Sequence, residues 1–202
     1  MPPIQFYFEL ASPYSYLASL QIEQLGASAN RSVDWLPVDI EVVWAAQGVL
    51  EAYAAIRRLK RSYIARDSQR CAAALGTVFA KPATAARDTA FAKLAYWGIH
   101  SSDPALAKIV IQAVWHRHFR EGAPIATAED LAAACVDTGL GAAAINLAAQ
   151  SPAAREAQGA ANAQAVRWGC FGIPWLVVDG ESYFGHDRLP HVAARLHAKA
   201  AA

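Results

Sequence analysis

The strand-like stretches of this chain lie at its two ends, and a long helical segment separates them. Residues 4–9 are rich in aromatic side chains and precede a turn, and residues 33–38 form a second apolar run, so both are predicted strands. Residues 175–178 and 182–184 flank an Asp-Gly pair, which is typical of a tight hairpin turn. The segment from about residue 45 to about residue 165 is Ala-rich and has a helical pattern.

The order of these elements narrows the choice of fold. Ser12 and Pro13 signal a helix start after the first strand, because Ser favours the N-cap position and Pro the first helical position. Strand, helix and strand indicate a parallel βαβ unit, and a final helix is predicted at residues 188–199. The whole order predicts an α/β chain: a single thioredoxin-like domain over residues 1–202, split by an all-helical insertion at about 45–165.

Local signals set the expected helix boundaries. Gly26 is expected to end the first helix. Within the insertion, sequences that contain Pro interrupt the helical pattern at residues 81–82, 101–104 and 122–124. We therefore expect several helices in the insertion rather than one.

Composition and charge exclude several classes of function. Hydrophobic residues make up 55% of the chain and charged residues 17%, which allows a sizeable core. The net charge of +1 gives no reason to expect nucleic acid or an anionic membrane as a partner. No apolar run approaches the ~20 residues of a membrane span, and the first residues lack a signal-peptide pattern. The basic cluster at residues 57–61 is expected to be the solvated face of a helix.

The cysteines indicate a reducing compartment. Cys71, Cys135 and Cys170 are odd in number and far apart, with no Cys-x-x-Cys spacing, and Cys170 is expected to be a buried, inert thiol. We therefore expect reduced thiols and a cytoplasmic protein.

No metal site is expected. His116 and His118 lie two residues apart on a predicted helix, so their side chains point to different sides and do not form a metal pair.

Ser12 opens a Ser-Pro-Tyr-Ser box at the start of the first helix. A helix N-terminus offers backbone N–H groups and the positive end of a dipole, so it stabilises an anion such as a thiolate. A serine hydroxyl there can donate a hydrogen bond to the thiolate of a ligand. The alternative is an ordinary N-cap serine, which the local sequence alone favours. With Ser at positions 12 and 15, no disulfide can form in the box, which excludes dithiol oxidoreductase chemistry at this site.

Two segments near the end of the chain are further candidates for a ligand site. Pro174 follows Ile173 just before a predicted strand, where a cis X–Pro bond is tolerated, although the trans bond is the commoner state. A cis bond would leave the Ile173 backbone free to pair with a peptide-like ligand. Asp187 is either a helix cap or an acceptor for a ligand's amino group. His186 is either a ligand donor or a solvated turn residue.

Four stretches together resemble one family. They are FYFELASPYSYLA at residues 6–18, KRSYIARD at 60–67, FGIP at 171–174 and FGHDR at 184–188. They resemble 2-hydroxychromene-2-carboxylate isomerases, which belong with the kappa-class glutathione transferases and are similar in fold to DsbA-type disulfide oxidoreductases. The resemblance spans nearly the full chain. It implies a thioredoxin-like homodimer with a helical insertion, glutathione as the cofactor and a small aromatic substrate.

The resemblance also implies a glutathione site, formed by Ser12, Pro13, Tyr14, Lys60, Ile173, Pro174, His186 and Asp187. Ser12 would hydrogen-bond the glutathione sulfur, and Ile173 would pair with the cysteinyl backbone. His186 and Asp187 would hold the γ-glutamyl end. Trp115 is expected to line the pocket for the second substrate.

One stretch departs from the family pattern. Family members often carry an Asn and a Pro after the second strand, near the glycyl end of glutathione. Residues 45–60 contain neither, and Gln47 is the candidate substitute.

The reaction that the resemblance implies interconverts cyclic 2-hydroxychromene-2-carboxylate and the open trans-o-hydroxybenzylidenepyruvate. A carbon–carbon double bond must rotate. A thiolate that adds to the conjugated carbon leaves a single bond, which rotates before the thiolate leaves. We therefore expect a glutathione-dependent isomerase of aromatic catabolism. Two alternatives stay open: a kappa-class-like glutathione transferase or peroxidase, and a non-catalytic thioredoxin-like binding protein.

Overall fold

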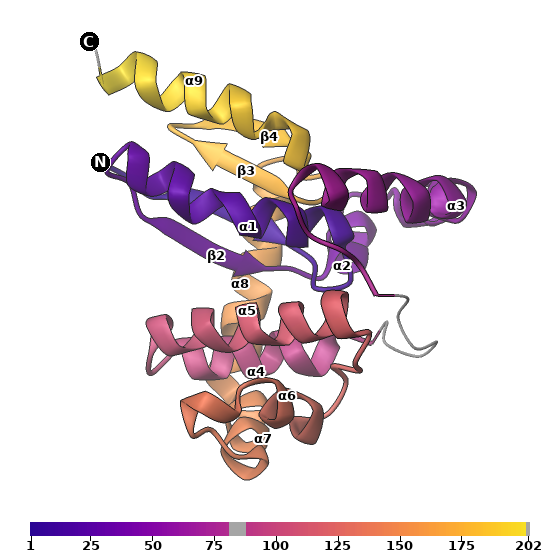
Figure 1. Ribbon diagram of the computed structural model, residues 1–202, viewed down its shortest axis with the longest axis vertical. Helices are drawn as coiled ribbons and strands as arrows, with labels where there is room; N and C mark the ends of the chain where they lie inside the picture. The colour runs from indigo at the N-terminus through magenta and orange to yellow at the C-terminus, as the bar shows by residue number, and fades with distance from the viewer. Residues whose placement is uncertain (81–87, 201–202) are drawn as a thin grey trace.

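A mixed four-stranded sheet lies at the centre of the structure, a computed structural model that describes residues 1–80 and 88–200 (Figure 1). In order across the sheet, its strands are β2 (Val33–Pro37), β1 (Ile4–Phe8), β3 (Trp175–Val178) and β4 (Glu181–Phe184). β1 runs parallel to β2 and antiparallel to β3, with Tyr7 opposite Trp175. The C-terminal end of β1 therefore meets the N-terminal end of β3, and the loops at these two ends lie together.

Helices cover both faces of this sheet and extend beyond one edge. The helices are α1 (Pro13–Ser28), α2 (Ile40–Ala46), α3 (Leu50–Ala74), α4 (Ala90–His100), α5 (Pro104–Glu121), α6 (Ala128–Ala134), α7 (Ala142–Gln150), α8 (Pro152–Arg167) and α9 (Leu189–Ala200), with the 3-10 helices η1 (Val136–Thr138) and η2 (His186–Arg188). α1 and α9 lie on one face, α8 passes behind the sheet, and α4 to α7 form a helical layer beyond β2 (Figure 1).

The helical layer is joined to the sheet by α4. Tyr96 donates its hydroxyl to the Trp35 carbonyl at 2.7 Å, and Trp97 donates its indole N–H to the Pro37 carbonyl at 3.2 Å. Both aromatic side chains are buried. They satisfy backbone carbonyls of β2 and its end while they bury large apolar surfaces.

The predicted fold class is confirmed, since the β-α-β and β-β-α ends form one sheet and helices α2 to α8 connect them. The predicted breaks at residues 101–104 and 122–124 are also confirmed, whereas the break predicted at 81–82 lies outside the described residues. The prediction that Gly26 ends α1 is wrong. A Cβ at Gly26 would lie 2.7 Å from the Arg31 carbonyl oxygen, so glycine permits a close backbone approach inside the helix.

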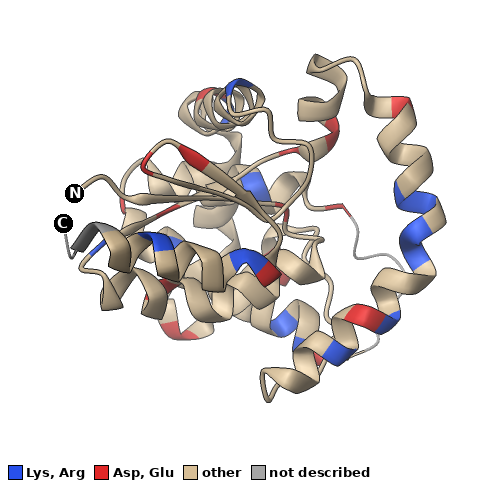
Figure 2. Cartoon of the chain, turned by 90° about the horizontal axis from the view of Figure 1, so that it is seen from above, with Lys and Arg blue, Asp and Glu red and all other residues tan. Residues whose placement is uncertain are grey.

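α3 extends away from the sheet and carries much of the positive charge (Figure 2). Its buried residues are Ser68 and Ala72, in its last two turns. The cluster at residues 57–61 is exposed, which confirms the expectation of a solvated helix face. Among the described helices, none combines the length and the apolar character that a membrane crossing needs.

Candidate functional site

Ser12 begins α1 at the corner that follows β1. Its Oγ accepts a hydrogen bond from the Ser15 backbone N–H at 3.2 Å, so the N-cap alternative is confirmed. Its own backbone N–H donates to the Glu9 carbonyl at 3.0 Å, which closes the turn between β1 and α1. The cap uses the Ser12 oxygen only as an acceptor, so the hydroxyl hydrogen remains available to a ligand. Capping and ligand donation are therefore compatible.

The loop before β3 lies beside this corner. The Ile173–Pro174 peptide bond is cis, the less common of the two states that the sequence left open, and the backbone role of Ile173 stays a prediction. The Pro174 carbonyl accepts from the Gly185 backbone N–H at 2.9 Å. The loop before β3 and the turn after β4 are thus held together.

Tyr14 connects the Ser12 corner to two other segments. Its ring stacks on the His186 imidazole, with centroids 4.9 Å apart, and its hydroxyl donates to Asp67 Oδ2 at 2.7 Å. The bond from Tyr14 and a second from Arg70 hold the pKa of Asp67 below its usual value. The structure thus brings Tyr14 and His186 together and adds Asp67, whose role the sequence analysis missed although its motif had been identified.

His186 is half-buried against Tyr14 rather than a solvated turn residue. Burial lowers its pKa, and the negative charges of Asp187 and Asp67 oppose this effect. The ring is therefore mainly neutral near pH 7. One nitrogen of a neutral imidazole donates and the other accepts, so His186 can do either toward a ligand.

Asp187 lies inside η2, whose N-cap is Gly185, and α9 begins two residues later at Leu189, so Asp187 holds the N-cap position of neither helix. Gly185 has a φ of 105°, and a Cβ there would lie 2.4 Å from Asp187 Oδ1. The Asp187 carboxylate is exposed and lies 3.5 Å from the Arg188 guanidinium. The helix-cap alternative is therefore wrong, and the ligand-acceptor alternative stays a prediction.

Trp115 does not line a pocket. Its side chain is 0% exposed, and its indole N–H donates to the Leu10 carbonyl at 2.8 Å. The ring packs among aromatic side chains of the core, including Phe8 and Trp35. Trp115 therefore stabilises the turn before Ser12 from the core side. The expectation that it lines the pocket for a second substrate is wrong.

Lys60 and Gln47 have different surroundings. Lys60 is exposed on α3, two helical turns before Asp67, and its contact with a ligand stays a prediction. Gln47 donates its side-chain amide to the Cys170 carbonyl at 3.1 Å, and Trp44 donates its indole N–H to the Phe171 carbonyl at 2.9 Å. Gln47 and Trp44 therefore tie α2 to the loop that leads to Pro174.

Cys170 lies deep beside this loop. Burial raises the pKa of its thiol to about 12, and the side chain lies 3.3 Å from the Gly172 carbonyl. Such a thiol carries almost no thiolate at neutral pH, so the expectation of an inert cysteine is confirmed. Within the described part of the chain, no group of His, Cys, Asp or Glu is arranged to hold a metal ion.

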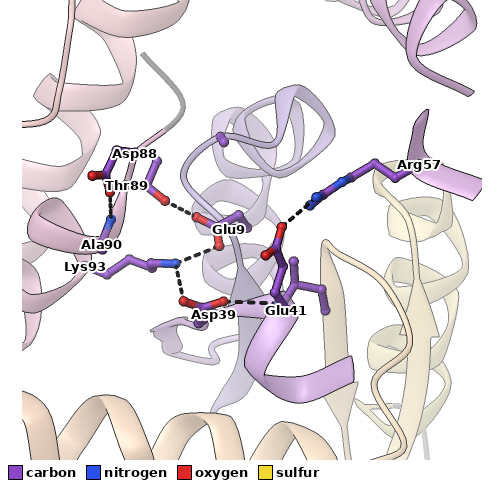
Figure 3. Close-up of a pocket in the computed structure, with 10 residues that line it drawn as sticks. Glu9, Asp39, Glu41, Arg57, Asp88, Thr89, Ala90 and Lys93 are labelled. Carbon is purple, nitrogen blue, oxygen red and sulfur yellow. Dashed lines mark hydrogen bonds and ion pairs between the residues drawn. The ribbon is translucent and has the colours of Figure 1, made fainter. Parts of the chain in front are cut away.

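A polar cavity of about 250 Å³ adjoins the Ser12 turn, and the sequence analysis did not identify it (Figure 3). Ala11, the residue before Ser12, lines it together with Glu9 and Lys93. The Lys93 ammonium lies 2.8 Å from Glu9 Oε2, and Thr89 donates its hydroxyl to Glu9 Oε1 at 2.6 Å. The side chains of Glu9 and Lys93 are 12% and 5% exposed, so both are largely buried at the edge of the cavity.

One signal for this network was present in the sequence. Lys93 is the one charged residue in an apolar stretch from Ala90 to Ile99. A charged side chain on an apolar helix face indicates a buried partner, because an unpaired buried charge is very costly. Its partner Glu9 lies 84 residues away, and no periodic pattern connects them.

Comparison with known proteins places the chain in a family. The model of the DSBA-like thioredoxin domain matches residues 3–197, so the chain belongs to the DSBA-like thioredoxin family. Within that class, the chain is 29% identical over 197 residues to a curated 2-hydroxychromene-2-carboxylate isomerase of Sphingobium xenophagum, covering 96% of this chain and 97% of the relative.

Solved structures agree on the fold. A 2-hydroxychromene-2-carboxylate isomerase structure superposes with a TM-score of 0.82 at 24% identity, covering 98% of this chain and 95% of that one. The cytosolic disulfide reductase DsbM of Pseudomonas aeruginosa, solved with GSH, superposes with a TM-score of 0.68 at 16% identity, covering 99% of this chain and 100% of that one.

Proposed function

We propose that this protein is a glutathione-dependent isomerase that interconverts 2-hydroxychromene-2-carboxylate and trans-o-hydroxybenzylidenepyruvate. The observation that carries the proposal is the Ser12 N-cap, which places a serine hydroxyl at the N-terminus of a 16-residue helix, at the edge of the sheet where the loop before β3 also lies. The similarity to a curated isomerase over 96% of the chain supports the choice of reaction.

The role of Ser12 is to favour the thiolate of bound glutathione. A hydrogen bond to a charged acceptor contributes roughly 1.5–3 kcal/mol, which corresponds to about one to two pKa units. The helix N-terminus acts in the same direction. A thiol whose pKa is about 8–9 in water is thereby brought toward 7. This thiolate adds to the conjugated carbon, the new single bond rotates, and the thiolate leaves unchanged.

The remainder of glutathione would bind across the loops that meet here. Ile173 would pair through its backbone with the cysteinyl unit, and His186 and Asp187 would hold the γ-glutamyl end. Lys60 is the proposed cation of the site on α3. The presence of GSH with DsbM, which shares the fold, supports glutathione as the ligand. We further propose a homodimer that acts on a small aromatic substrate in the cytoplasm, where glutathione is abundant.

Thermal unfolding with reduced glutathione tests the ligand. A ligand that binds only the folded protein adds roughly 2.7 kcal/mol at 100 times its Kd, so we expect the Tm to rise with glutathione and the rise to shrink in Ser12→Ala. Ser151→Ala is the matched control, because Ser151 is also an N-cap serine followed by proline and accepts from the Ala154 N–H at 3.1 Å. It should lose a cap but keep the full glutathione shift.

Turnover then separates the three candidate functions. The isomerase needs glutathione and does not consume it, whereas a transferase or peroxidase consumes it. Full isomerisation by glutathione-free enzyme would rule out the thiolate mechanism. A protein without any glutathione shift or turnover, in which Ser12→Ala loses only about 1 kcal/mol of cap energy, would be the non-catalytic binding protein.

A further inference from the structure

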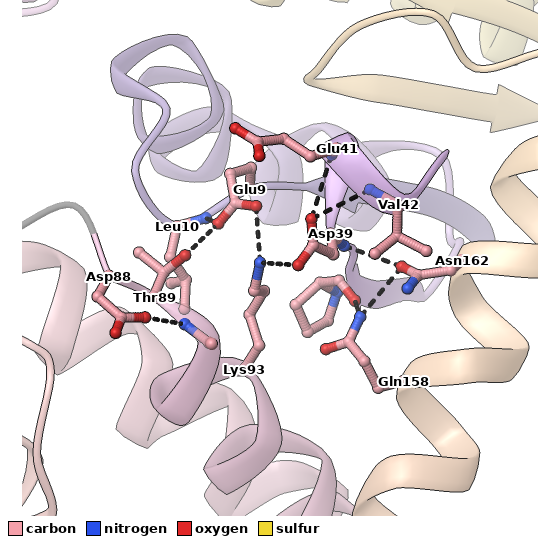
Figure 4. A network of polar contacts seen from close by, with 12 residues as sticks. Glu9, Leu10, Asp39, Glu41, Val42, Asp88, Thr89, Lys93, Gln158 and Asn162 are labelled. Atoms are coloured by element: carbon pink, nitrogen blue, oxygen red, sulfur yellow. Dashed lines mark hydrogen bonds and ion pairs between the residues drawn. The ribbon is translucent and has the colours of Figure 1, made fainter. Parts of the chain in front are cut away.

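Lys93 lies where the helical layer meets the turn that ends at Ser12. It comes from the first turn of α4 and is one of the residues that line the polar cavity. Its ammonium lies between the Glu9 and Asp39 carboxylates (Figure 4). Glu9 joins it to the turn, because Glu9 Oε1 also accepts the Leu10 N–H at 2.9 Å and the Glu9 carbonyl accepts the Ser12 N–H at 3.0 Å. Lys93 is therefore fixed to the same short segment that positions Ser12.

The ammonium keeps donor capacity for a ligand. A lysine has three N–H donors. One donates to Glu9 Oε2 at 2.8 Å, and Asp39 Oδ2 lies farther away, at 3.5 Å. Asp39 is itself held in place, since its Oδ1 caps α2. The two carboxylates offset the cost of burying the cation, and at most two of its three donors face them.

We propose that Lys93 is a catalytic residue of the isomerisation and that it donates to the carbonyl oxygen of the open 2-oxo acid. The inference rests on the proposed function, because it assumes that a thiolate sits at Ser12. The cavity adjoins that corner through Ala11, so a substrate in it would present its conjugated chain to the sulfur while its carbonyl oxygen faces Lys93.

The chemical step balances without another reagent. The sulfur forms a bond to the conjugated carbon, and the electron pair of the double bond moves to make an enolate whose negative charge lies on the carbonyl oxygen. The former double bond is then single and rotates. The enolate pair reforms the double bond as the sulfur–carbon bond breaks, and the thiolate is restored.

The charge distribution of the cavity restricts how the substrate can lie in it. The charged residues that line the cavity are four carboxylates and two cations: Glu9, Asp39, Glu41, Asp88, Arg57 and Lys93. Both cations are already paired with carboxylates. These carboxylates repel the carboxylate of the substrate, so it would point out of the cavity, whereas the ketone oxygen is neutral when the substrate binds and can face Lys93. Negative charge grows on this oxygen only in the transition state, where a fixed, largely buried cation is most effective.

Substitution of Lys93 tests the proposal through kinetics. Removal of one donor to a developing oxyanion lowers kcat by about 100- to 1,000-fold, so Lys93→Met should lose that much kcat with little change in KM. Lys93→Arg keeps a cation and should retain most of the activity. The Tm shift with glutathione should persist in both variants, since glutathione binding does not use Lys93.

Two controls separate catalysis from structure. Lys108→Met is the matched control, because it also removes a lysine that is paired with a glutamate, Glu23 at 2.7 Å, but one that lies outside this cavity, so it should affect stability but not kcat. The pair Glu9→Gln with Lys93→Met leaves no unpaired buried charge, so it should fold even where Lys93→Met alone does not, and its kcat should still be low. A folded Lys93→Met or double variant with kcat within about threefold of wild type would overturn the proposal. Wild-type protein without glutathione-dependent turnover would instead contradict the proposed function itself.

Discussion

The ring of Tyr14 lies flat against the imidazole of His186, with the ring planes inclined by only 7°. Tyr14 belongs to the Ser-Pro-Tyr-Ser box near the start of the chain, and His186 follows the last strand. The stack therefore joins the two ends of the sequence at the Ser12 corner. Because the Tyr14 hydroxyl also donates to Asp67, one side chain links α1, α3 and η2.

Tyr14→Phe should destabilise the protein by about 1 kcal/mol. The substitution keeps the ring stack and removes the 2.7 Å hydrogen bond to Asp67, and a typical hydrogen bond contributes roughly 0.5–1.5 kcal/mol. Urea unfolding measures the loss. In the double variant with Asp67→Asn, the second substitution should cost less than it does alone, since the bond is already absent. Fully additive losses would show that the hydrogen bond contributes nothing.

The stability of the protein should fall as the pH drops below 6.5, partly because of His186. Burial holds the pKa of His186 below the 6.5 of a free histidine. Between the folded pKa and 6.5 the unfolded chain therefore binds more protons, so the free energy of unfolding rises with pH across this window. The pKa values of His100 and His118 are also lowered by burial and add to the slope.

His186→Phe isolates this contribution. The variant keeps an aromatic ring against Tyr14 but cannot take up a proton, so the difference between its urea midpoints at pH 7.5 and pH 5.5 should be smaller than in wild type. Part of the slope should remain, because His100 and His118 are unchanged. An unchanged slope would mean that His186 does not titrate differently in the folded and unfolded states.

The sequence predicted the parts of the site that depend on local signals. The Ser12 cap, the hairpin after β3 and the helical insertion follow from turn and cap residues that act over a few positions. Contacts between residues that are far apart in the sequence could not be predicted from such local signals. The Tyr14–Asp67 bond spans 53 residues, and the Glu9–Lys93 pair spans 84.

Two expectations failed because the three-dimensional neighbours of a residue decide its role. The family resemblance implied that Trp115 lines a substrate pocket, yet packing in the core buries it completely. Trp115 is buried by Phe8 and Trp35, which lie far from it in the sequence. Gly26 was interpreted as a helix end because glycine commonly ends helices. The structure shows another reason for glycine here: the Arg31 carbonyl lies so close that a side chain at position 26 would clash with it. Gly26 is explained by the turn that follows α1, because the chain folds back over the helix within five residues.

The buried pair Arg31–Asp179 should be one of the larger contributors to stability. The guanidinium lies 3.1 Å from Asp179 Oδ1, and the two side chains are 2% and 6% exposed. Removal of one partner of a buried ion pair is strongly destabilising, so Arg31→Met should cost up to about 3–5 kcal/mol. Arg31→Met with Asp179→Asn should recover part of this loss, since the buried negative charge is removed together with the buried positive one.

An exposed pair provides the comparison for Arg31. Arg57 and Glu41 lie 2.5 Å apart, with side chains 51% and 53% exposed. Ion pairs in water contribute only about 0–1 kcal/mol, so Arg57→Met should change the urea midpoint little. If the two Met variants lost equal stability, burial would not be the factor that separates these pairs.

Two glycine substitutions should act in opposite directions. Gly98 lies in α4 where a Cβ would come within 2.0 Å of the Ala148 carbonyl oxygen in α7, so Gly98→Ala must push these helices apart. Such overpacking costs roughly 1–3 kcal/mol and sometimes more. Gly159 lies inside α8 with open space where its Cβ would be. Gly159→Ala should therefore stabilise by about 0.5–1 kcal/mol, since alanine is the better helix former.

Gly98→Ala also connects packing to the site. The displaced helix α4 carries Lys93, and the 2.8 Å contact of Lys93 with Glu9 depends on how α4 sits against the turn before Ser12. We expect Gly98→Ala to lower the urea midpoint and also kcat, measured where the variant is still folded, whereas Gly159→Ala should raise the midpoint and leave kcat unchanged. A Gly98→Ala protein with wild-type kcat would show that the close contact of α4 with α7 does not determine the position of Lys93.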